Sequence, residues 1–473
     1  MPDVTDTAGT RTEKDSLGAL EVPADAYYGV QTARAIANFP ISGERLHPEM
    51  VRAVARIKIA TARANKEVGA LDQTKQEAIV KAAEEILAGN HDKEFVVDAY
   101  QAGAGTSFHM NVNEVIANRA AEILGGRRGD TALVSPNDHV NMAQSTNDVI
   151  PTAIRLAAYA LSGPLLEEMR ALSLSFGGRA EAFAHVLKSG RTHLQDAVPV
   201  TLGQEFSGYA VCVEGWADSL TRSRDGLLAV GLGGNAAGTG INAHPEYRTR
   251  AVKHLAALTG APFHPAKNLF EAMQSMAPFV RVSSDLRGFA LDMTRIANDL
   301  RLLASGPTTG LFEILLPAVQ PGSSIMPGKV NPVMLEMTNM VCYQVIGYDT
   351  TVAFAAQAGQ LELNVMMPII AHDLTRALAL LTTALRALRE KCIDGITANE
   401  EVCRRFFEIS PSIATALNPY IGYLAAAEIA KESAKTGKTV VQLVREKKLL
   451  TEDQIAKVFS PENMTHPASG GNS

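Results

Sequence analysis

The chain has 473 residues, of which 46% are hydrophobic and 20% are charged, as in an ordinary soluble globular protein. This length predicts roughly two to four domains, with a core large enough to need no disulfide bonds. The formal net charge is −6, from 44 basic and 50 acidic residues, and implies no basic face of the kind that nucleic-acid binding requires. Only 5% of the residues are aromatic, which favours helices over β-sandwiches, because strands are rich in aromatic and β-branched side chains.

The cysteines and the N-terminal segment indicate the compartment. Cys212, Cys342, Cys392 and Cys403 form no CxxC pair and stand at no metal-ligand spacing, so we expect free thiols in a reducing cytoplasm. The first residues contain no apolar signal region, and no window approaches about 18 uninterrupted apolar residues. We therefore expect a cytoplasmic protein without a membrane span. Disorder is expected in roughly the first 14 residues and after Thr465.

Helical periodicity runs through most of the chain. It predicts helices in the first half over 48–68, 74–88, 112–125, 151–185 and 203–225. Apolar residues then recur at steps of three and four from Phe279 to Leu303, which is a heptad seam. A further long helix is predicted from Pro332 to about Thr351, because proline is tolerated in a first turn, and a second seam runs from Leu374 to Leu388. Helices this long need partners, so we expect an extended bundle, packed between subunits or, alternatively, within a monomer.

Two interruptions of the helical pattern suggest domain boundaries. One lies at 126–147 and the other at 394–401, where DGITANEE precedes shorter helical segments. We expect an N-terminal domain over 1–144, a central helix-bundle domain over 145–398 and a small C-terminal helical domain over 399–473.

The most informative segment is GSSIMPGKVNP at 322–332. Two glycines and two prolines exclude a regular helix, so we expect a loop between two long helices. Glycines let backbone N–H groups approach a ligand closely, while Lys329 supplies a positive charge and Asn331 a hydrogen-bond donor. The loop is therefore predicted to hold a carboxylate, with a purely structural turn as the alternative.

Other polar clusters are less specific. QSTND at 144–148 precedes an apolar helix, and its side chains suit helix capping, which is compatible with anion binding at a helix N-terminus. GRTHLQD at 190–196 holds one histidine, a residue that on its own is more often structural, and GAGTS at 103–107 is again rich in small and hydroxyl side chains. A loose GxGxxA match at 231–236 lacks the strand and the acidic residue of a dinucleotide site, so we expect no nucleotide there.

GSSIMPGKVNP resembles the signature of the fumarase/aspartase superfamily. Three more blocks resemble that superfamily in the same order: PNDHVNMAQSTND at 136–148, GRTHLQDAVPVTLGQEF at 190–206 and SPSIATALNPYIGY at 410–423. The resemblance extends from Leu17 to about Pro467. It implies a mainly α, three-domain fold whose long central helix bundle forms a twenty-helix core in a homotetramer, with active sites shared between subunits.

The resemblance also implies a reaction. Members of the superfamily add or remove a small group across the double bond of fumarate or of a fumarate-containing product. A base takes a proton from the carbon beside a carboxylate, which gives a dianionic aci-carboxylate, and the leaving group departs from the neighbouring carbon. Because that proton is weakly acidic, the site has to stabilise the charge that develops on the carboxylate. No organic cofactor and no metal is implied.

Individual residues receive roles by the same resemblance. Ser323 is the catalytic base, acting as an oxyanion, which requires strong stabilisation because a serine hydroxyl is a very weak base. Glu336 stands where the superfamily orients its histidine through the second ring nitrogen, and Asn147 lies with His193 near the leaving group. The carboxylate that becomes the aci form is held by Thr192, His193, Lys329 and Asn331. The other carboxylate is held by Thr106, Ser145, Thr146 and Ser324.

A few positions separate the ammonia-lyases of the superfamily from its hydratases. Fumarases usually have Ser at the position of Ala104, His at the position of Ser135, and SSND at 145–148, and this chain has none of these. VPADAYYGVQT (22–32) and KCIDGITANEEVC (391–403) instead resemble aspartases. The resemblance therefore implies reversible deamination of L-aspartate to fumarate and ammonia by anti-elimination. Fumarate hydration and a catalytically silent structural relative are the alternatives.

Three positions depart from the superfamily pattern. Thr308 stands where Arg is usual, and Met367 stands where many aspartases have Glu. The pair Phe108–His109 replaces a pair that usually ends in Asn. These departures are expected to affect subunit contacts or the range of substrates.

Overall fold

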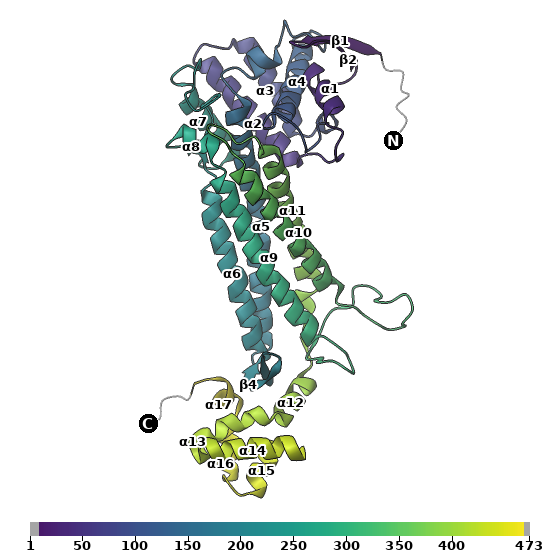
Figure 1. The fold of residues 1–473 in the computed structure, drawn as a ribbon, viewed down its shortest axis with the longest axis vertical. Helices are drawn as coiled ribbons and strands as arrows, with labels where there is room; N and C mark the ends of the chain where they lie inside the picture. Colours follow the sequence, from purple (N-terminus) through teal and green to yellow (C-terminus); the bar gives the residue numbers. More distant parts are fainter. Residues whose placement is uncertain (1–8, 468–473) are drawn as a thin grey trace. The chain divides into compact units, whose positions relative to one another are not determined.

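The fold is described here from a computed structural model, which covers residues 9–467. The chain is mainly α-helical, as the composition predicts (Figure 1). It packs as two compact units, each built from three segments. Unit 1 consists of Met1–Leu166, Asp218–Gly288 and Tyr343–Leu381. Unit 2 consists of Glu167–Ala217, Phe289–Cys342 and Thr382–Ser473. The division into three domains stays a prediction.

Unit 1 combines short helices with two small sheets. Strands β1 and β2 form an antiparallel hairpin that pairs Thr10 with Pro23 at one end and Asp15 with Gly18 at the other. Strands β5 and β6 form a short parallel pair. The elements that lie wholly in unit 1 are β1 (Thr10–Asp15), β2 (Gly18–Pro23), α1 (Val30–Asn38), α2 (Pro48–Glu67), α3 (Gln73–Leu87), α4 (Thr106–Ile123), β5 (Ala229–Val230), α7 (Tyr247–Thr259), β6 (His264–Pro265) and α8 (Leu269–Gln274).

Unit 2 contains a second hairpin and the C-terminal helices. Strands β3 and β4 are antiparallel, with a register shift between Ser189 and Arg191, and β7 pairs antiparallel with β8. The elements that lie wholly in unit 2 are β3 (Leu187–Thr192), β4 (Gln195–Thr201), β7 (Ile314–Leu315), β8 (Thr397–Ala398), α12 (Glu400–Ile409), α13 (Asn418–Ile421), α14 (Tyr423–Thr436), α15 (Val440–Glu446), α16 (Glu452–Val458) and α17 (Pro461–Thr465).

The longest helices contribute residues to both units. They are α5 (Thr146–Ala182), α6 (Leu202–Asp225), α9 (Ala277–Leu303), α10 (Val333–Gln357) and α11 (Met367–Lys391). The heptad seam of α9, from Phe279 to Leu303, is confirmed as core, since none of its apolar members is more than 7% exposed. The seam of α11 from Leu374 to Leu388 is equally buried, at 1% exposure or less. The predicted helices therefore exist, and their apolar faces are buried.

Polar side chains link neighbouring long helices inside each unit. In unit 2 the Trp216 indole of α6 donates a 2.8 Å hydrogen bond to Asp292 of α9, and Asn339 of α10 donates a 2.9 Å bond to Asn298 of α9. The links in unit 1 are Ser219 of α6 with Asp285 of α9, and Arg287 of α9 with Asp349 of α10, both at 2.9 Å. Such paired groups fix the register of helices whose apolar seams alone would tolerate sliding.

Helix α5 is unusually apolar for its length. An 18-residue window within it has a mean hydropathy of 1.4, so by length and composition α5 is the one helix among residues 9–467 that could cross a membrane. This window is not an uninterrupted apolar run, because its mean hydropathy stays high despite occasional polar residues. In the fold, 72% of the window is buried, as in the core helix of a helical protein.

All four cysteines are free, as predicted.

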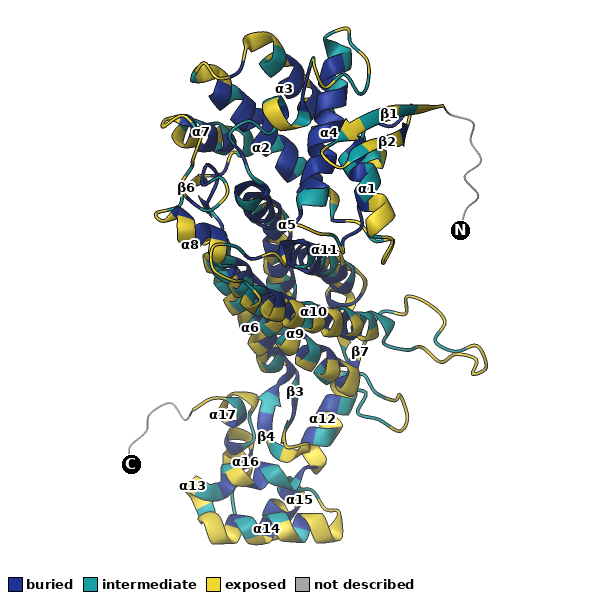
Figure 2. Ribbon diagram, turned by 45° about the horizontal axis from the view of Figure 1, so that its top comes forward, coloured by how far each residue is buried: buried dark blue, intermediate teal, exposed yellow. Residues whose placement is uncertain are grey.

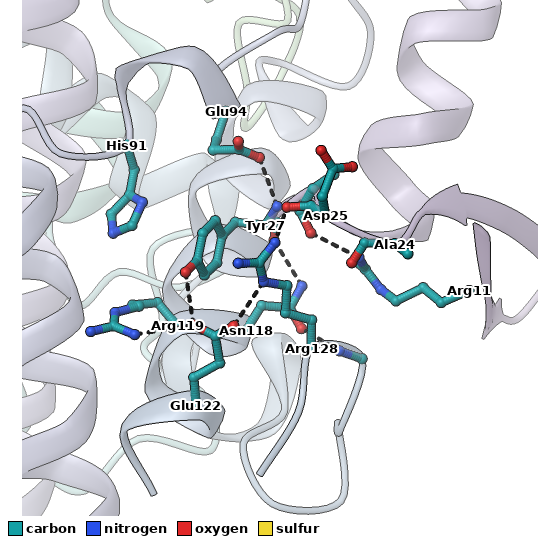
Figure 3. Close-up of polar contacts among 12 residues, drawn as sticks. Arg11, Ala24, Asp25, Tyr27, His91, Glu94, Asn118, Arg119, Glu122 and Arg128 are labelled. Carbon is teal, nitrogen blue, oxygen red and sulfur yellow. Dashed lines mark hydrogen bonds and ion pairs between the residues drawn. The ribbon is translucent and has the colours of Figure 1, made fainter. Parts of the chain in front are cut away.

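The N-terminal segment is more ordered than predicted. Disorder was expected over the first residues, but Thr10–Asp15 forms β1 because its backbone pairs with β2, and the residues before Gly9 lie outside those described. The segment that follows is held by Tyr27, whose hydroxyl donates to Glu122 at 2.7 Å and whose backbone N–H donates to Glu94 at 2.7 Å (Figure 3). The Arg128 guanidinium lies 3.8 Å from the centre of the Tyr27 ring.

The C-terminal helices share an apolar cluster. Its buried members include Phe407, Leu417 and Ile429, and it extends to Val444 and Val458. In Figure 2 the outer surface of α14 is largely exposed, whereas α4 is buried along most of its length. The predicted tail after Thr465 is described only to Pro467.

A buried carboxylate caps the first helix of unit 1. Gly29, the residue before α1, offers no capping side chain. Glu114 of α4, only 4% exposed, replaces it by accepting hydrogen bonds from the backbone N–H groups of Gly29 and Gln31 at 2.8 Å and of Thr32 at 3.1 Å. The Thr32 hydroxyl donates a fourth bond at 2.6 Å. Negative charge at a helix N-terminus is favourable, which suits a carboxylate cap. Because Glu114 belongs to α4, the same contact joins α4 to the start of α1.

The substitution Glu114→Ala should therefore destabilise the protein. It leaves these donors buried without an acceptor, and we expect the free energy of unfolding to fall by about 2–4 kcal/mol in urea denaturation. Glu77→Ala on α3 is the matched control, because Glu77 is exposed and only accepts a bond from Gln73. A loss within about 0.5 kcal/mol of that control would show that the cap contributes little.

Candidate active site

The segment 322–332 is a loop between α9 and α10, as predicted. Its ends are tied together, because Gly322 donates its N–H to the carbonyl of Lys329 at 2.8 Å and the Asn331 side chain donates to the carbonyl of Gly322 at 2.5 Å. A Cβ atom at Gly322 would lie 2.4 Å from the carbonyl oxygen of Lys329, so only glycine fits there. The loop is thus a closed turn with a defined backbone.

The Ser323 hydroxyl has the surroundings of an oxyanion. Its oxygen accepts hydrogen bonds from the backbone N–H groups of Ile325 at 3.2 Å and Met326 at 2.9 Å. Donors aimed at one oxygen favour its negatively charged form. This geometry agrees with the chemistry expected for Ser323, although the role itself remains a proposal.

The same loop presents its remaining side chains outward. Lys329 is exposed, and Ile325 is 83% exposed although it is apolar. Small-molecule sites are typically cavities of about 300–1,000 Å³. A cavity of 870 Å³ in unit 2 lies within this range and is lined by Lys329, Asn331 and Phe312. An exposed apolar loop beside a cavity marks an interaction surface.

Thr192 and His193 lie at the tip of the β3–β4 hairpin. Thr192 pairs with Gln195, so His193 and Leu194 form a two-residue turn with φ of 52° and 59°. Such turns favour Asn and Gly, and other residues with positive φ are strained. Both residues are exposed, so a purely structural role for His193 is not supported by burial. The hairpin therefore presents the His193 imidazole outward. The positive φ values at His193 and Leu194 are backbone strain of the kind found at functional turns.

A buried ion cluster fixes the base of this hairpin. Glu313 is fully buried and pairs with Arg191 at 2.9 Å and with Lys188 at 3.2 Å. Lys188 also pairs with Glu205 at 2.7 Å, and burial raises the pKa of Glu205. Sequence analysis missed Glu313 and Lys188, because neither lies in a motif and only the fold brings them together.

In unit 1 the QSTND segment caps α5. The Ser145 hydroxyl accepts the N–H of Asn147 at 3.2 Å, and the Asp148 carboxylate accepts the N–H of Ser145 at 3.0 Å. Asp148 also accepts the N–H groups of Gly233 and Asn235, both at 3.0 Å, so the 231–236 segment is a structural loop held by this carboxylate. Asp148 is completely buried, and burial raises its pKa to about 6.

Thr106 and Thr146 bring two hydroxyls together. Thr106 begins α4 and Thr146 begins α5, and their Oγ atoms lie 3.1 Å apart. Thr106 also borders a cavity of 810 Å³ in unit 1, together with Gly103 and Ser135. Thr106 and Thr146, which the superfamily resemblance assigns to one carboxylate, thus lie side by side at helix N-termini, where anions are favourable.

The proposed site residues fall in both units of the chain. Unit 1 holds Thr106, Ser145, Thr146 and Asn147, whose side chain donates to the carbonyl of Ala236 at 2.8 Å. Unit 2 holds Thr192, His193, Ser323, Ser324, Lys329, Asn331 and Glu336. Within unit 2, His193 lies at the tip of the β3–β4 hairpin and Glu336 lies in the first turn of α10. Among residues 9–467, no group of three or more His, Cys, Asp or Glu side chains is arranged to hold a metal ion.

Comparison with known proteins identifies the family. Residues 18–347 match a family model described as a lyase, and residues 413–466 match one described as the fumarase C C-terminus. The aspartate ammonia-lyase of Bacillus subtilis (strain 168) is 48% identical over 98% of this chain and 97% of its own length.

Solved structures agree with this assignment. A fumarate lyase:delta crystallin from Brucella melitensis, bound to cobalt, is 48% identical, with a TM-score of 0.94 over 97% of this chain and 100% of that one. A class II fumarase from Schistosoma mansoni is 36% identical, with a TM-score of 0.93 over 98% of this chain and 100% of that one. Sequence and fold therefore agree along almost the whole length, and the chain belongs to the fumarase/aspartase superfamily of lyases.

Proposed function

We propose that the protein is an aspartate ammonia-lyase, which converts L-aspartate reversibly to fumarate and ammonia. The main support is its 48% identity to an aspartate ammonia-lyase over 98% of the chain, compared with 36% identity to a class II fumarase. Ala104, Ser135 and the sequence STND at 145–148 also favour the ammonia-lyase over the hydratase.

The reaction proceeds in two steps in this proposal. The Ser323 oxyanion takes the proton from C3 of L-aspartate, and the C–H electron pair moves into the neighbouring carboxylate to give the dianionic aci form. The electrons then return to form the C2–C3 double bond as the C2–N bond breaks, and the protonated amino group (–NH3+) leaves with the bonding pair as neutral ammonia. The N–H groups of Ile325 and Met326 stabilise the oxyanion that begins the sequence.

The carboxylates are held by two sets of donors. Lys329 offers a charge to the aci-carboxylate, with Asn331, Thr192 and His193 as hydrogen-bond donors. Thr106, Ser145, Thr146 and Ser324 bind the other carboxylate, and Asn147 with His193 receives the leaving amine. Glu336 orients the imidazole of His193. The buried Glu313 cluster supports this arrangement by fixing the hairpin that carries His193.

Oligomerisation would complete the site. We infer a homotetramer in the cytoplasm, in which the five long helices of each chain give a core of twenty helices. Exposed Ile325 and Leu194, at 83% and 70%, are apolar side chains that a neighbouring subunit would cover. The separate groups of site residues then come from different subunits, as do His193 and Glu336.

Replacement of the proposed base tests the mechanism. We expect Ser323→Ala to remove nearly all turnover of L-aspartate, because no other hydroxyl receives the N–H groups of Ile325 and Met326. Its tetramer should remain assembled in size-exclusion chromatography with light scattering. Ser207→Ala, at an exposed serine of α6, is the control and should keep normal turnover. More than about a tenth of the wild-type rate in Ser323→Ala would refute the assignment.

A paired substrate assay tests the choice of reaction. We expect fumarate absorbance to rise when the purified protein receives L-aspartate and to remain constant when it receives L-malate. Class II fumarase activity is the second candidate, because the Schistosoma mansoni enzyme shares the fold over 98% of this chain. Fumarate formation from L-malate alone would favour that candidate, and no product from either substrate would indicate a silent relative.

A further inference from the structure

A buried chain of side chains runs beneath the two threonines of unit 1. It begins at Lys58 of α2, which is fully buried and lies with its Nζ 2.7 Å from Nε2 of His109. The other ring nitrogen of His109, Nδ1, lies 2.9 Å from the Oγ of Thr146. His109 is 1% exposed and Thr146 is 9% exposed, so only the end of the chain reaches the surface. One imidazole therefore connects a buried amine to a hydroxyl proposed to bind substrate.

The other partners of Lys58 are fixed as acceptors. Its Nζ lies 3.0 Å from Oδ1 of Asn141 and 2.8 Å from Oε1 of Gln144. The amide nitrogen of Asn141 donates to the carbonyl of Gln144, and that of Gln144 donates to the carbonyls of Val140 and Met142. Neither amide can flip without losing these bonds, so both oxygens face Lys58 and both take a proton from it.

The remaining contact, between Lys58 and His109, depends on the charge of the lysine. A charged ammonium has three protons and donates the third to Nε2, so the neutral imidazole carries its own proton on Nδ1. That N–H then donates to Thr146, so the hydroxyl proton of Thr146 points away from His109, toward a ligand or toward the Thr106 Oγ 3.1 Å away. A neutral amine has only two protons, so it accepts from Nε2–H. Nδ1 is then an acceptor, and it draws the Thr146 proton inward.

The groups around the chain are consistent with such a switch. Burial lowers the pKa of Lys58 well below its usual range, and the charge of Asp148 from α5 opposes this effect. Burial and the charge of Lys58 lower the pKa of His109 well below its usual range, so the ring is neutral near pH 7. Tyr247 from α7 faces Asp148, and burial raises its pKa, so it stays un-ionised. Lys58 is therefore the group whose loss of charge the contacts link to the Thr146 hydroxyl.

We propose that His109 is a positioning residue that couples the charge of buried Lys58 to the Thr146 hydroxyl, which donates to a substrate carboxylate only while Lys58 is protonated. The inference rests on the proposed function in taking Thr146 as a carboxylate ligand.

The sign of the pH effect follows from linkage. A bound carboxylate accepts the Thr146 proton, which favours charged Lys58, so binding raises the pKa of Lys58 and takes up a proton. Below the pKa of the free protein, the Kd is constant. Above it, the Kd rises by about tenfold for each pH unit until the pKa of the complex is reached.

Calorimetry with an unreactive dicarboxylate measures this coupling directly. At each of a series of pH values from acidic to alkaline, succinate is titrated into the full-length protein in two buffers whose ionisation enthalpies differ. The difference in observed heat gives the number of protons taken up. We expect uptake to rise toward about one proton per site with increasing pH, together with a rise in Kd.

Two substitutions of His109 test its contact with Lys58 and its contact with Thr146 separately. His109→Gln places an amide near the Nε2 position, which keeps a partner for Lys58 but leaves Thr146 with Thr106 alone. His109→Asn places an amide near the Nδ1 position, which keeps a partner for Thr146 but not for Lys58. We expect both to lose the proton uptake and the pH dependence of the Kd. In turnover, their KM for L-aspartate should no longer rise with pH, while the pH dependence of kcat stays as in the wild type.

His254→Asn is the matched control. His254 of α7 contacts Glu67 and none of the side chains that connect Lys58 to Thr146, so this variant should keep normal proton uptake. Unchanged uptake in both His109 variants would overturn the proposal. No uptake in the wild type at any pH, or no saturable succinate binding, would also overturn it. Turnover of L-aspartate by the wild type is measured separately. Its absence alongside normal succinate coupling would refute the proposed function and leave the coupling intact.

Discussion

Removing a proton beside a carboxylate places a second negative charge on that group, and the organisation of the proposed site follows from the need to hold this charge. Charge stabilisation requires donors that are fixed before the reaction begins, because donors that must reorganise lose most of their effect. The chain supplies them at the ends of helices and in tight turns. Ser323 receives two N–H groups from its own loop, and Thr146 lies at the first turn of α5. The long helices serve mainly to place these short segments.

Buried charge keeps the donors in place. Glu313 holds the hairpin of His193 through Arg191, and Asp148 holds the start of α5 against the 231–236 loop. Each of these carboxylates is fully buried, which is costly unless every oxygen is paired. Lys58 extends the same principle to a cation, but with a neutral imidazole as one partner, so its charge can respond to the ligand. The ion pairs of Glu313 thus support the proposed site residues of unit 2, whereas the N–H bonds of Asp148 and the responsive contact of Lys58 support those of unit 1.

Local rules predicted most of the helices and the loop at 322–332, because heptad spacing, glycine and proline act over a few residues. The same rules did not identify β1, since a short hairpin depends on pairing between segments whose own propensity is weak. Sequence resemblance supplied Ser323 and Lys329, which lie in a motif. It could not supply Lys58 or Glu313, because their partners are 51 to 125 residues away in sequence and only the fold brings them into contact. His109 was visible only as a departure from Asn.

In the proposed tetramer, groups from different subunits complete each active site. Co-expression of Ser323→Ala chains with Thr146→Ala chains measures this directly, because mixed tetramers contain sites free of both substitutions only when the two residues come from different subunits. We expect the mixture to recover about a quarter of the wild-type rate if subunits combine at random, although each parent is nearly inactive. A mixture no more active than its parents would contradict the account, because it would place Ser323 and Thr146 of one chain in the same site.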